Sequence, residues 1–248
     1  MEAIVLTCDK YRPSTEHMIF QYNRLWPDHP FRFRIPYQTL IGPQSANREY
    51  RPCSPAFKST ILTLLEDFDD EQLIYWCMDD KYPIKLQLTR IRALFPFVFD
   101  LPSNVSGILF CRCRDMLKKY ALTGDSIRTP QGYLLLRRNN YLQIWLHQFM
   151  RVKVLRYLFQ SFPDDISFAK QMDPLKNKIP LPPSHALYVT AKNLAVFGES
   201  TTRGRLTANC AQSMRRYDLP VPTSFALDNQ HTVMGKQPLL RWRRGWVK

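Results

Sequence analysis

The sequence is poor in glycine and lacks long apolar runs. Only 8 of its 248 residues are glycine, which argues against a flexible or low-complexity chain. No apolar run approaches the ~20 residues that a membrane-spanning helix needs. The first residues, MEAIVLTCDKY, contain neither a basic segment nor an apolar core, so we expect no signal peptide. These absences favour a folded domain, and we expect it in the cytoplasm.

The chain also lacks a recognisable metal or disulfide pattern of cysteines. It has 6 cysteines, and several stand in apolar, strand-like runs, where cysteine behaves as a small hydrophobic residue. The CRC triplet at 111–113 has no second Cys or His pair at a zinc-like spacing. We therefore expect reduced, buried thiols.

Positive charge is in excess. There are 35 Lys and Arg against 21 Asp and Glu, which gives a formal net charge of +14. Such a balance favours an anionic partner, for example nucleic acid, anionic lipid or a phosphorylated small molecule. No RNP-like strand pair, helix-turn-helix or basic stripe on one helix face is present, and the basic residues are scattered. Nucleic acid is therefore the less favoured partner, and a nucleic-acid-binding protein remains an alternative.

The first third of the chain alternates between strand and helix patterns. Apolar runs at 3–8, 31–37 and 73–78 predict strands, and the segments at 14–25 and 54–68 carry apolar stripes at helical spacing. This alternation predicts an α/β fold with a mixed, mostly parallel sheet flanked by helices. Further on we expect helices at 84–95 and 149–162 and strands at 105–113 and 185–200. Ligands of such sheets bind at the carboxyl ends of the strands.

Acidic residues stand at those strand ends. Asp9 follows the first strand, and Asp79 and Asp80 end the strand LIYWCM. Adjacent carboxylates repel each other and are costly to desolvate unless a cation lies between them. A divalent cation, Mn²⁺ or Mg²⁺, would suit such a pair and would complete its shell with phosphate oxygens. The alternative is that the pair only caps the next turn, with Lys81 as its ion-pair partner.

The segments AIVLTCDKY and SPAFKSTILTLLEDFDDEQLIYWCMDDKYPI resemble the nucleotide-sugar-binding half of GT-A-type glycosyltransferases. YLQIWLHQFMRVKVLRYLF and FGESTTRGR resemble later parts of capsule-type relatives. The resemblance covers roughly residues 3–210 and implies one GT-A-like (Rossmann-like) domain that transfers a sugar from a nucleotide-diphosphosugar donor. Its acidic motif is MDDK rather than a clean D-x-D, so Lys81 offers an alternative to the cation. A GT-A-like domain without activity is a further alternative.

The resemblance also implies roles for individual residues on the donor side. Thr7, Asp9 and Tyr11 would line the base and ribose site, and Lys58 near a helix N-terminus would reach the diphosphate. The alternative for Lys58 is a solvated surface lysine. Asp79 would face the ribose or the sugar.

Further residues are implied as metal, phosphate and base groups. Asp80 would hold the metal, with His231 as a late ligand, and Arg203 would clamp phosphate. Asp173 is the candidate base that takes the proton of the acceptor hydroxyl, with Asp165 as the second choice. Glu199 is a further acidic candidate. The ordinary alternatives are loop aspartates, a structural histidine and a solvent-facing arginine.

The resemblance divides the chain into a nucleotide-binding half (1–83), an acceptor-side half (84–210) and a basic, aromatic C-terminal segment (211–248). The segment ends in RWRRGWVK, which suits an anionic lipid surface, a lipid-linked acceptor or nucleic acid. We therefore expect a nucleotide-sugar donor and a glycan or lipid-linked acceptor as partners, with peripheral membrane contact through this segment as an open alternative. The other alternative is that its tryptophans pack on the core.

Overall fold

The computed structural model describes residues 1–112, 121–166, 169–199, 201–202, 205–216, 218 and 227–228. Its helices are η1 (Asp9–Tyr11, a 3₁₀ turn), α1 (Arg12–Leu25), α2 (Phe57–Leu64), α3 (Leu88–Phe99), α4 (Val152–Gln160), α5 (Ala169–Leu175) and α6 (Ala208–Arg216). The strands are β1 (Glu2–Leu6), β2 (Arg32–Tyr37), β3 (Arg48–Pro52), β4 (Leu73–Met78), β5 (Lys81–Leu86), β6 (Gly107–Leu109), β7 (Leu122–Arg128), β8 (Leu134–Arg138), β9 (Gln148–Arg151), β10 (Leu187–Thr190), β11 (Ala195–Glu199), β12 (Thr201–Thr202), β13 (Arg205–Thr207) and β14 (Leu227–Asp228).

One nine-stranded sheet forms the centre of the molecule, in the order β3-β2-β1-β4-β9-β6-β10-β8-β7. The first four strands of this order pair in parallel, as do β6 and β10. The pairs that include β9 or β8 are antiparallel. Seven of the nine strands therefore run in one direction. The predicted α/β fold with a mixed, mostly parallel sheet is confirmed.

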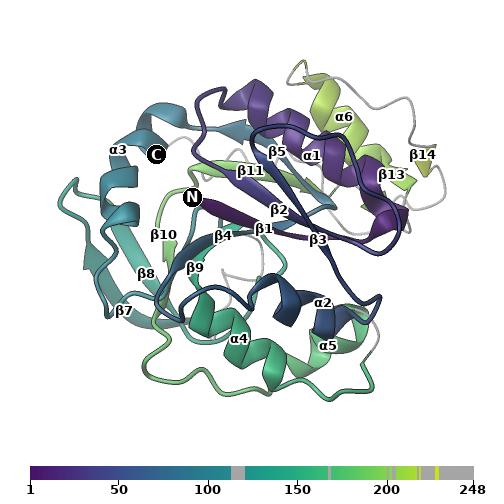
Figure 1. Ribbon diagram of the computed structural model, residues 1–248. Helices are drawn as coiled ribbons and strands as arrows, with labels where there is room; N and C mark the ends of the chain where they lie inside the picture. The colour runs from purple at the N-terminus through teal and green to yellow at the C-terminus, as the bar shows by residue number, and fades with distance from the viewer. Residues whose placement is uncertain are drawn as a thin grey trace.

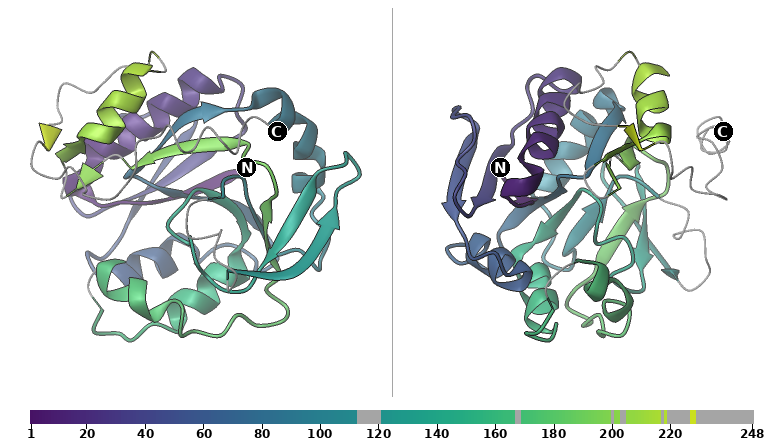
Figure 2. Two further views of the ribbon diagram at one scale, coloured as in Figure 1. Left: turned by 180° about the vertical axis from the view of Figure 1, so that it is seen from behind. Right: turned by 90° about the vertical axis from the view of Figure 1, so that its right-hand side faces the viewer.

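Helices cover both faces of this sheet, and the alternation of side chains along the strands explains why (Figure 1). In β1, Ala3 and Val5 join one buried cluster with residues of α1, α3 and α6. Ile4 and Leu6 point to the other face and join a second cluster with residues of α2, α4 and α5. Successive side chains of a strand point to opposite faces, so a strand covered on both faces has no polar positions. Figure 2 shows the same three layers from two further sides.

The three predicted strands of the first third are neighbours, as expected, but other elements differ. The predicted helix at 84–95 is wrong at its start, because residues 81–86 form β5, which pairs with β11. Pairing with a distant strand overrides the helical spacing of Ile84 and Leu88. The predicted helix at 149–162 likewise begins as a strand, since β9 inserts between β4 and β6. The edge strands β3 and β7 were not predicted, because both are polar.

The sheet joins both predicted halves of the chain. Strand β9 of the later half pairs with β4 of the first. Helix α6 runs across the predicted boundary at 210/211, and its Ala211 and Met214 are buried in the core. In the described part of the chain, no helix is both long enough and apolar enough to cross a membrane. Cys77 and Cys111 are buried, and Cys77 is a free thiol.

Candidate functional site at the carboxyl ends of β1 and β4

The parallel pairing of β1 with β4 brings the first site residues together. Leu6 lies opposite Met78 in the register, so Thr7 and Asp79 leave the sheet side by side. The Thr7 hydroxyl donates a hydrogen bond of 2.7 Å to Oδ2 of Asp79, and it accepts one of 2.8 Å from the hydroxyl of Thr15. Thr15 lies in the first turn of α1. Two strands and a helix N-terminus therefore converge on Asp79.

Asp79 and Asp80 form the turn between β4 and β5. Burial raises the pKa of Asp79 well above its ordinary value, and the charge of Asp80 raises it further, although the Thr7 hydrogen bond acts in the opposite direction. Asp80 is 42% exposed, and its Oδ2 lies 3.5 Å from Nζ of Lys81. The turn thus combines a carboxyl group that holds its proton tightly with an accessible carboxylate. A carboxyl group as strongly perturbed as Asp79 is typical of a functional position.

Glu199 reaches the same region through the sheet pairing of β5 with β11. Its backbone lies opposite Lys81, the residue that follows Asp80. Directly opposite residues of an antiparallel pair have Cα atoms about 4.5–5.5 Å apart. Glu199, although far from Asp80 in the sequence, therefore has its backbone next to the acidic turn.

Asp9 anchors a loop. Its Oδ2 accepts hydrogen bonds from the amides of Thr39 (2.7 Å) and Leu40 (2.8 Å), and its Oδ1 accepts one from the amide of Gln38 (3.1 Å). Burial alone would raise the pKa of Asp9, but these amides outweigh it and lower the pKa to about 2. The Arg12 guanidinium adds a contact of 3.3 Å. A ribose could bind to this carboxylate only by displacing these donors, and the predicted ribose contact stays a prediction.

Lys58 binds the carbonyl end of another helix, α4. Its Nζ donates to the carbonyls of Phe162 (2.6 Å) and Gln160 (3.3 Å) and pairs with Asp164 at 2.5 Å. A cation at the carbonyl end of α4 is favourable because those carbonyls have no partner within the helix. Lys58 is only 17% exposed, so it is not a solvated surface lysine either. Tyr11 is partly buried at the end of η1, four residues after Thr7 in the chain.

The structure adds His147, which the sequence reasoning missed. His147 is 1% exposed, and its Nε2 lies 2.8 Å from the carbonyl oxygen of Met78, the residue before Asp79. Its Nδ1 lies 2.6 Å from the hydroxyl of Tyr22, which lies 2.9 Å from the hydroxyl of Tyr75. A lone histidine in the apolar run IWLHQF signals a buried, hydrogen-bonded group, but it does not name the partners.

The directions of these bonds follow from chemistry. A carbonyl oxygen only accepts, so Nε2 of His147 carries the hydrogen and Nδ1 accepts from Tyr22. Tyr22 in turn accepts from Tyr75. Burial lowers the pKa of His147 to about 3, against the opposing effect of the Met78 carbonyl, and the positive charge of Lys81 lowers it further. His147 therefore stays neutral and ties α1 and β4 to the backbone of the acidic turn.

Asp173 is held in a fixed orientation. Its Oδ1 accepts a hydrogen bond of 2.7 Å from Nε1 of Trp145 and also contacts the ammonium of Lys176, which is 6% exposed. Both partners found among the described residues bind Oδ1, and the side chain is 56% exposed. Trp145 lies two residues before His147, in the segment beside the end of β4. Asp165 is exposed in the loop that follows α4.

Two of the predicted site residues, Arg203 and His231, lie outside the described residues. Among the residues that the structure describes, no group of three or more His, Cys, Asp or Glu side chains could hold a metal ion. The turn supplies the carboxylate of Asp80 and the carboxyl group of Asp79, and a cation there would need phosphate or water oxygens as its remaining ligands.

Neither a family model nor a curated protein matches this sequence. Solved structures of similar shape include S. aureus TarS residues 1–349 (TM-score 0.44, 13% identity), which matches over 78% of this chain. The chain spans only 59% of that TarS structure. Galactosyltransferase LgtC with donor and acceptor sugar analogs has a TM-score of 0.37 and 12% identity, over 90% of this chain and 84% of its own.

A third similar structure is Francisella tularensis 2-C-methyl-D-erythritol 4-phosphate cytidylyltransferase (TM-score 0.40, 9% identity), over 82% of this chain and 94% of its own. All three TM-scores lie below 0.5. The function must therefore be argued from the residues of this chain.

The buried network makes a prediction about stability. Tyr22→Phe removes the donor of His147 Nδ1 and the acceptor of Tyr75 and leaves two buried groups unpaired, so it should lower the free energy of unfolding by about 2–4 kcal/mol. Tyr75→Phe removes only one donor and should cost about 1 kcal/mol. Chemical denaturation of both variants measures the difference. Equal losses would contradict the direction assigned to these bonds.

The Asp9 carboxylate makes a prediction about pH. Its pKa in the folded protein is lowered to about 2 from 3.8, so its stabilising effect is complete above the unfolded value and is lost as the pH falls towards 2. Asp9→Asn should be roughly 1–2 kcal/mol less stable than the parent near neutral pH, and this gap should close between pH ~4 and ~2. Denaturation at several pH values measures the gap. Asp125→Asn, at a side chain 67% exposed, is the control for loss of a surface charge.

Proposed function

We propose that the chain is a glycosyltransferase that moves a sugar from a nucleotide-diphosphosugar donor to an acceptor hydroxyl. The Asp79–Asp80 turn is the observation that carries this proposal. Its carboxyl pair lies at the carboxyl edge of a mostly parallel sheet, which is where such folds bind ligands. The raised pKa of Asp79, caused by burial and then by Asp80, is the kind of perturbation that functional sites require.

The donor would bind between the acidic turn and the start of α1. The cap residue of this helix, Tyr11, makes no side-chain capping bond, and no acidic residue lies in the first turn. The Arg12 amide bonds to the carbonyl of Asp9, and Pro13 has no N–H, so it is the helix dipole that favours an anion at this end. Asp80 would hold a divalent cation, Mn²⁺ or Mg²⁺, which when bound neutralises the leaving diphosphate. Asp79 and Thr7 would face the ribose or the sugar.

Asp173 is the proposed base of an inverting transfer. The acceptor oxygen would attack the anomeric carbon, the bond from that carbon to the diphosphate would break, and the acceptor proton would pass to Asp173. Trp145 and Lys176 hold Oδ1 of this carboxylate, so Oδ2 is the oxygen that would receive the proton. Glu199 is a further acidic candidate, supported by its strand position opposite Lys81.

The donor experiment is a thermal-shift screen of UDP-, GDP- and dTDP-sugars, with CMP-sugars as a monophosphate comparison, each with and without Mn²⁺. A ligand at about 100 times its Kd should add roughly 2.7 kcal/mol of stability. Asp80→Asn should lose this gain. Asp173→Asn is the matched control, an exposed carboxylate on the acceptor side, and should keep it. Donor binding by Asp80→Asn equal to the parent's would exclude the assigned role, and its unfolding would favour the turn-capping alternative.

Salt dependence separates this proposal from nucleic-acid binding. A basic surface that contacts 6–10 phosphates loses about 10³–10⁵ in affinity between 50 and 200 mM salt. A nucleotide sugar has two phosphates held by short bonds, so its affinity should change far less. Measuring both affinities over this range tests the difference. Tight oligonucleotide binding that survives at 200 mM, with no response to any nucleotide sugar, would overturn the proposal. No response to either class would favour an inactive domain.

A further inference from the structure

The loop that follows β2 is held rigidly at the same edge of the sheet as the acidic turn. Asp9 binds the amides of Gln38, Thr39 and Leu40 through its two carboxylate oxygens. The Arg12 guanidinium donates to the carbonyl of Leu40 at 3.0 Å. Each of these three loop residues is therefore fixed through its backbone by the residues that follow β1.

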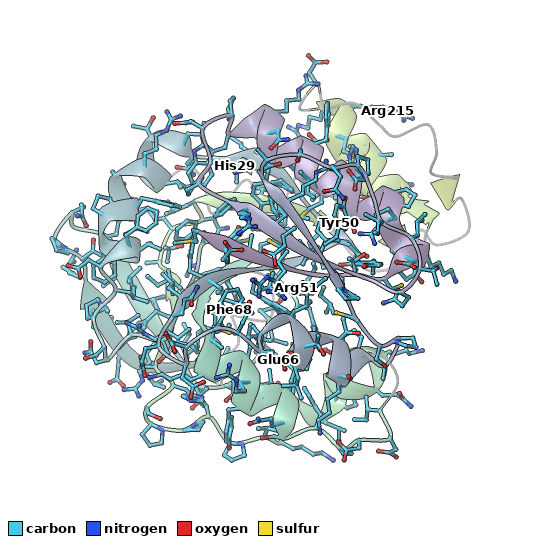
Figure 3. The ribbon with its side chains drawn as sticks, viewed as in Figure 1. His29, Tyr50, Arg51, Glu66, Phe68 and Arg215 are labelled. Atoms are coloured by element: carbon cyan, nitrogen blue, oxygen red, sulfur yellow. The ribbon has the colours of Figure 1, made fainter. Side chains whose placement is uncertain are left out.

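The other end of the loop is fixed against β3. The carbonyl of Pro43 accepts hydrogen bonds of 3.1 Å from Nη1 of Arg48 and 3.1 Å from the hydroxyl of Tyr50. Tyr50, labelled in Figure 3, extends from β3 towards α1. A Cβ atom at Gly42 would collide with this hydroxyl, so the loop backbone lies directly on the tyrosine. Both ends of residues 38–43 are thus anchored.

Between these anchors the loop presents two apolar side chains to solvent. Leu40 is 51% exposed and Ile41 is 50% exposed. The other large exposed hydrophobic residues among the described ones, Phe20 (48%) and Phe99 (57%), stand singly on α1 and α3. Single exposed apolar residues are ordinary, but an adjacent pair on an immobilised backbone cannot retreat from water. Two side chains are fewer than the large patches that mark protein interfaces contain, but their fixed, exposed position makes them a candidate for a small contact.

The size and charge of the feature decide which partner fits. Stable protein interfaces bury about 1,200–2,000 Å², far more than two side chains provide, which argues against a second copy of the chain. A bilayer interface needs only a few apolar side chains, together with positive charge that attracts anionic lipid. Beside the loop, Arg12 pairs with Asp9 and Arg48 pairs with Glu16. Lys10, exposed in η1 next to Asp9, adds a positive charge at this surface, and the whole chain has a net charge of +14.

We propose that Leu40 and Ile41 insert into the interfacial layer of an anionic membrane. The loop would then turn the carboxyl edge of the sheet, and with it the Asp79–Asp80 turn, towards the bilayer. This contact does not depend on sugar transfer, and it is distinct from any contact made by the C-terminal segment, because it requires two apolar side chains of a loop near the N-terminus.

Vesicle co-sedimentation of the full chain tests the proposal, with phosphatidylcholine vesicles that contain about 30% phosphatidylglycerol. The parent should bind these vesicles and not pure phosphatidylcholine. The double variant Leu40→Ser/Ile41→Ser keeps all charges and the C-terminal segment, and should bind roughly tenfold or more weakly. Phe99→Ser removes an equally exposed apolar side chain from α3 and should bind as the parent does. Leu40→Trp should bind more tightly.

Several results would overturn the proposal. These are no vesicle binding by the parent, unchanged binding by Leu40→Ser/Ile41→Ser, or an equal loss in Phe99→Ser. Unchanged binding by the double variant would assign the membrane contact to the C-terminal segment or to charge alone. The thermal unfolding of each variant shows whether it is folded. Weaker binding by a folded Leu40→Ser/Ile41→Ser and tighter binding by a folded Leu40→Trp are opposite effects, which misfolding would not produce together. Donor binding is measured without vesicles, so failure here and failure of the transferase proposal are separate results.

Discussion

The parallel pairing of β1 with β4 is the constraint on which the candidate site depends. The register that sets Leu6 opposite Met78 also sets Thr7 beside Asp79. Both strands are buried on both faces, so a slip by one residue would move apolar side chains into the wrong layer. The pairing is therefore fixed by the core and not by the polar residues at its end. The acidic turn takes its position from packing that has no chemical role of its own.

The neutral His147 connects the later half of the chain to this turn. Taking a charged imidazole out of water would be costly, so the group remains neutral and uses both nitrogens in hydrogen bonds. Its partner Met78 immediately precedes Asp79, so the backbone of the turn is held from the side opposite to Thr7. The same segment carries Trp145, which orients Asp173. The short segment from Trp145 to His147 therefore contacts both the proposed donor side, through Met78, and the proposed acceptor side, through Asp173.

Part of the positive charge of the chain is used inside the fold. The arginines that donate to backbone carbonyls at strand ends, helix ends and loops include Arg12, Arg34, Arg138, Arg151 and Arg156. Their guanidinium groups suit this task because they offer several donors in a rigid plane. Arg51 and Phe68 are labelled in Figure 3. Arg51 pairs with Asp67, and Asp67 also binds Arg34, whose guanidinium lies over the Phe68 ring. An excess of arginine in the sequence is therefore only partly a surface property.

The sequence by itself determined the fold class, the three parallel strands and the edge where Asp9 and Asp80 stand, because apolar runs and their spacing report burial directly. Tertiary structure alone decided what each polar residue binds. Asp9 and Lys58 read as ligand groups, yet their partners are loop amides and helix-end carbonyls up to about a hundred residues away. The β5 segment reads as a helix, and only its pairing with β11 makes it a strand. Hydrogen-bond partners depend on distances between segments far apart in the chain, which local patterns do not contain.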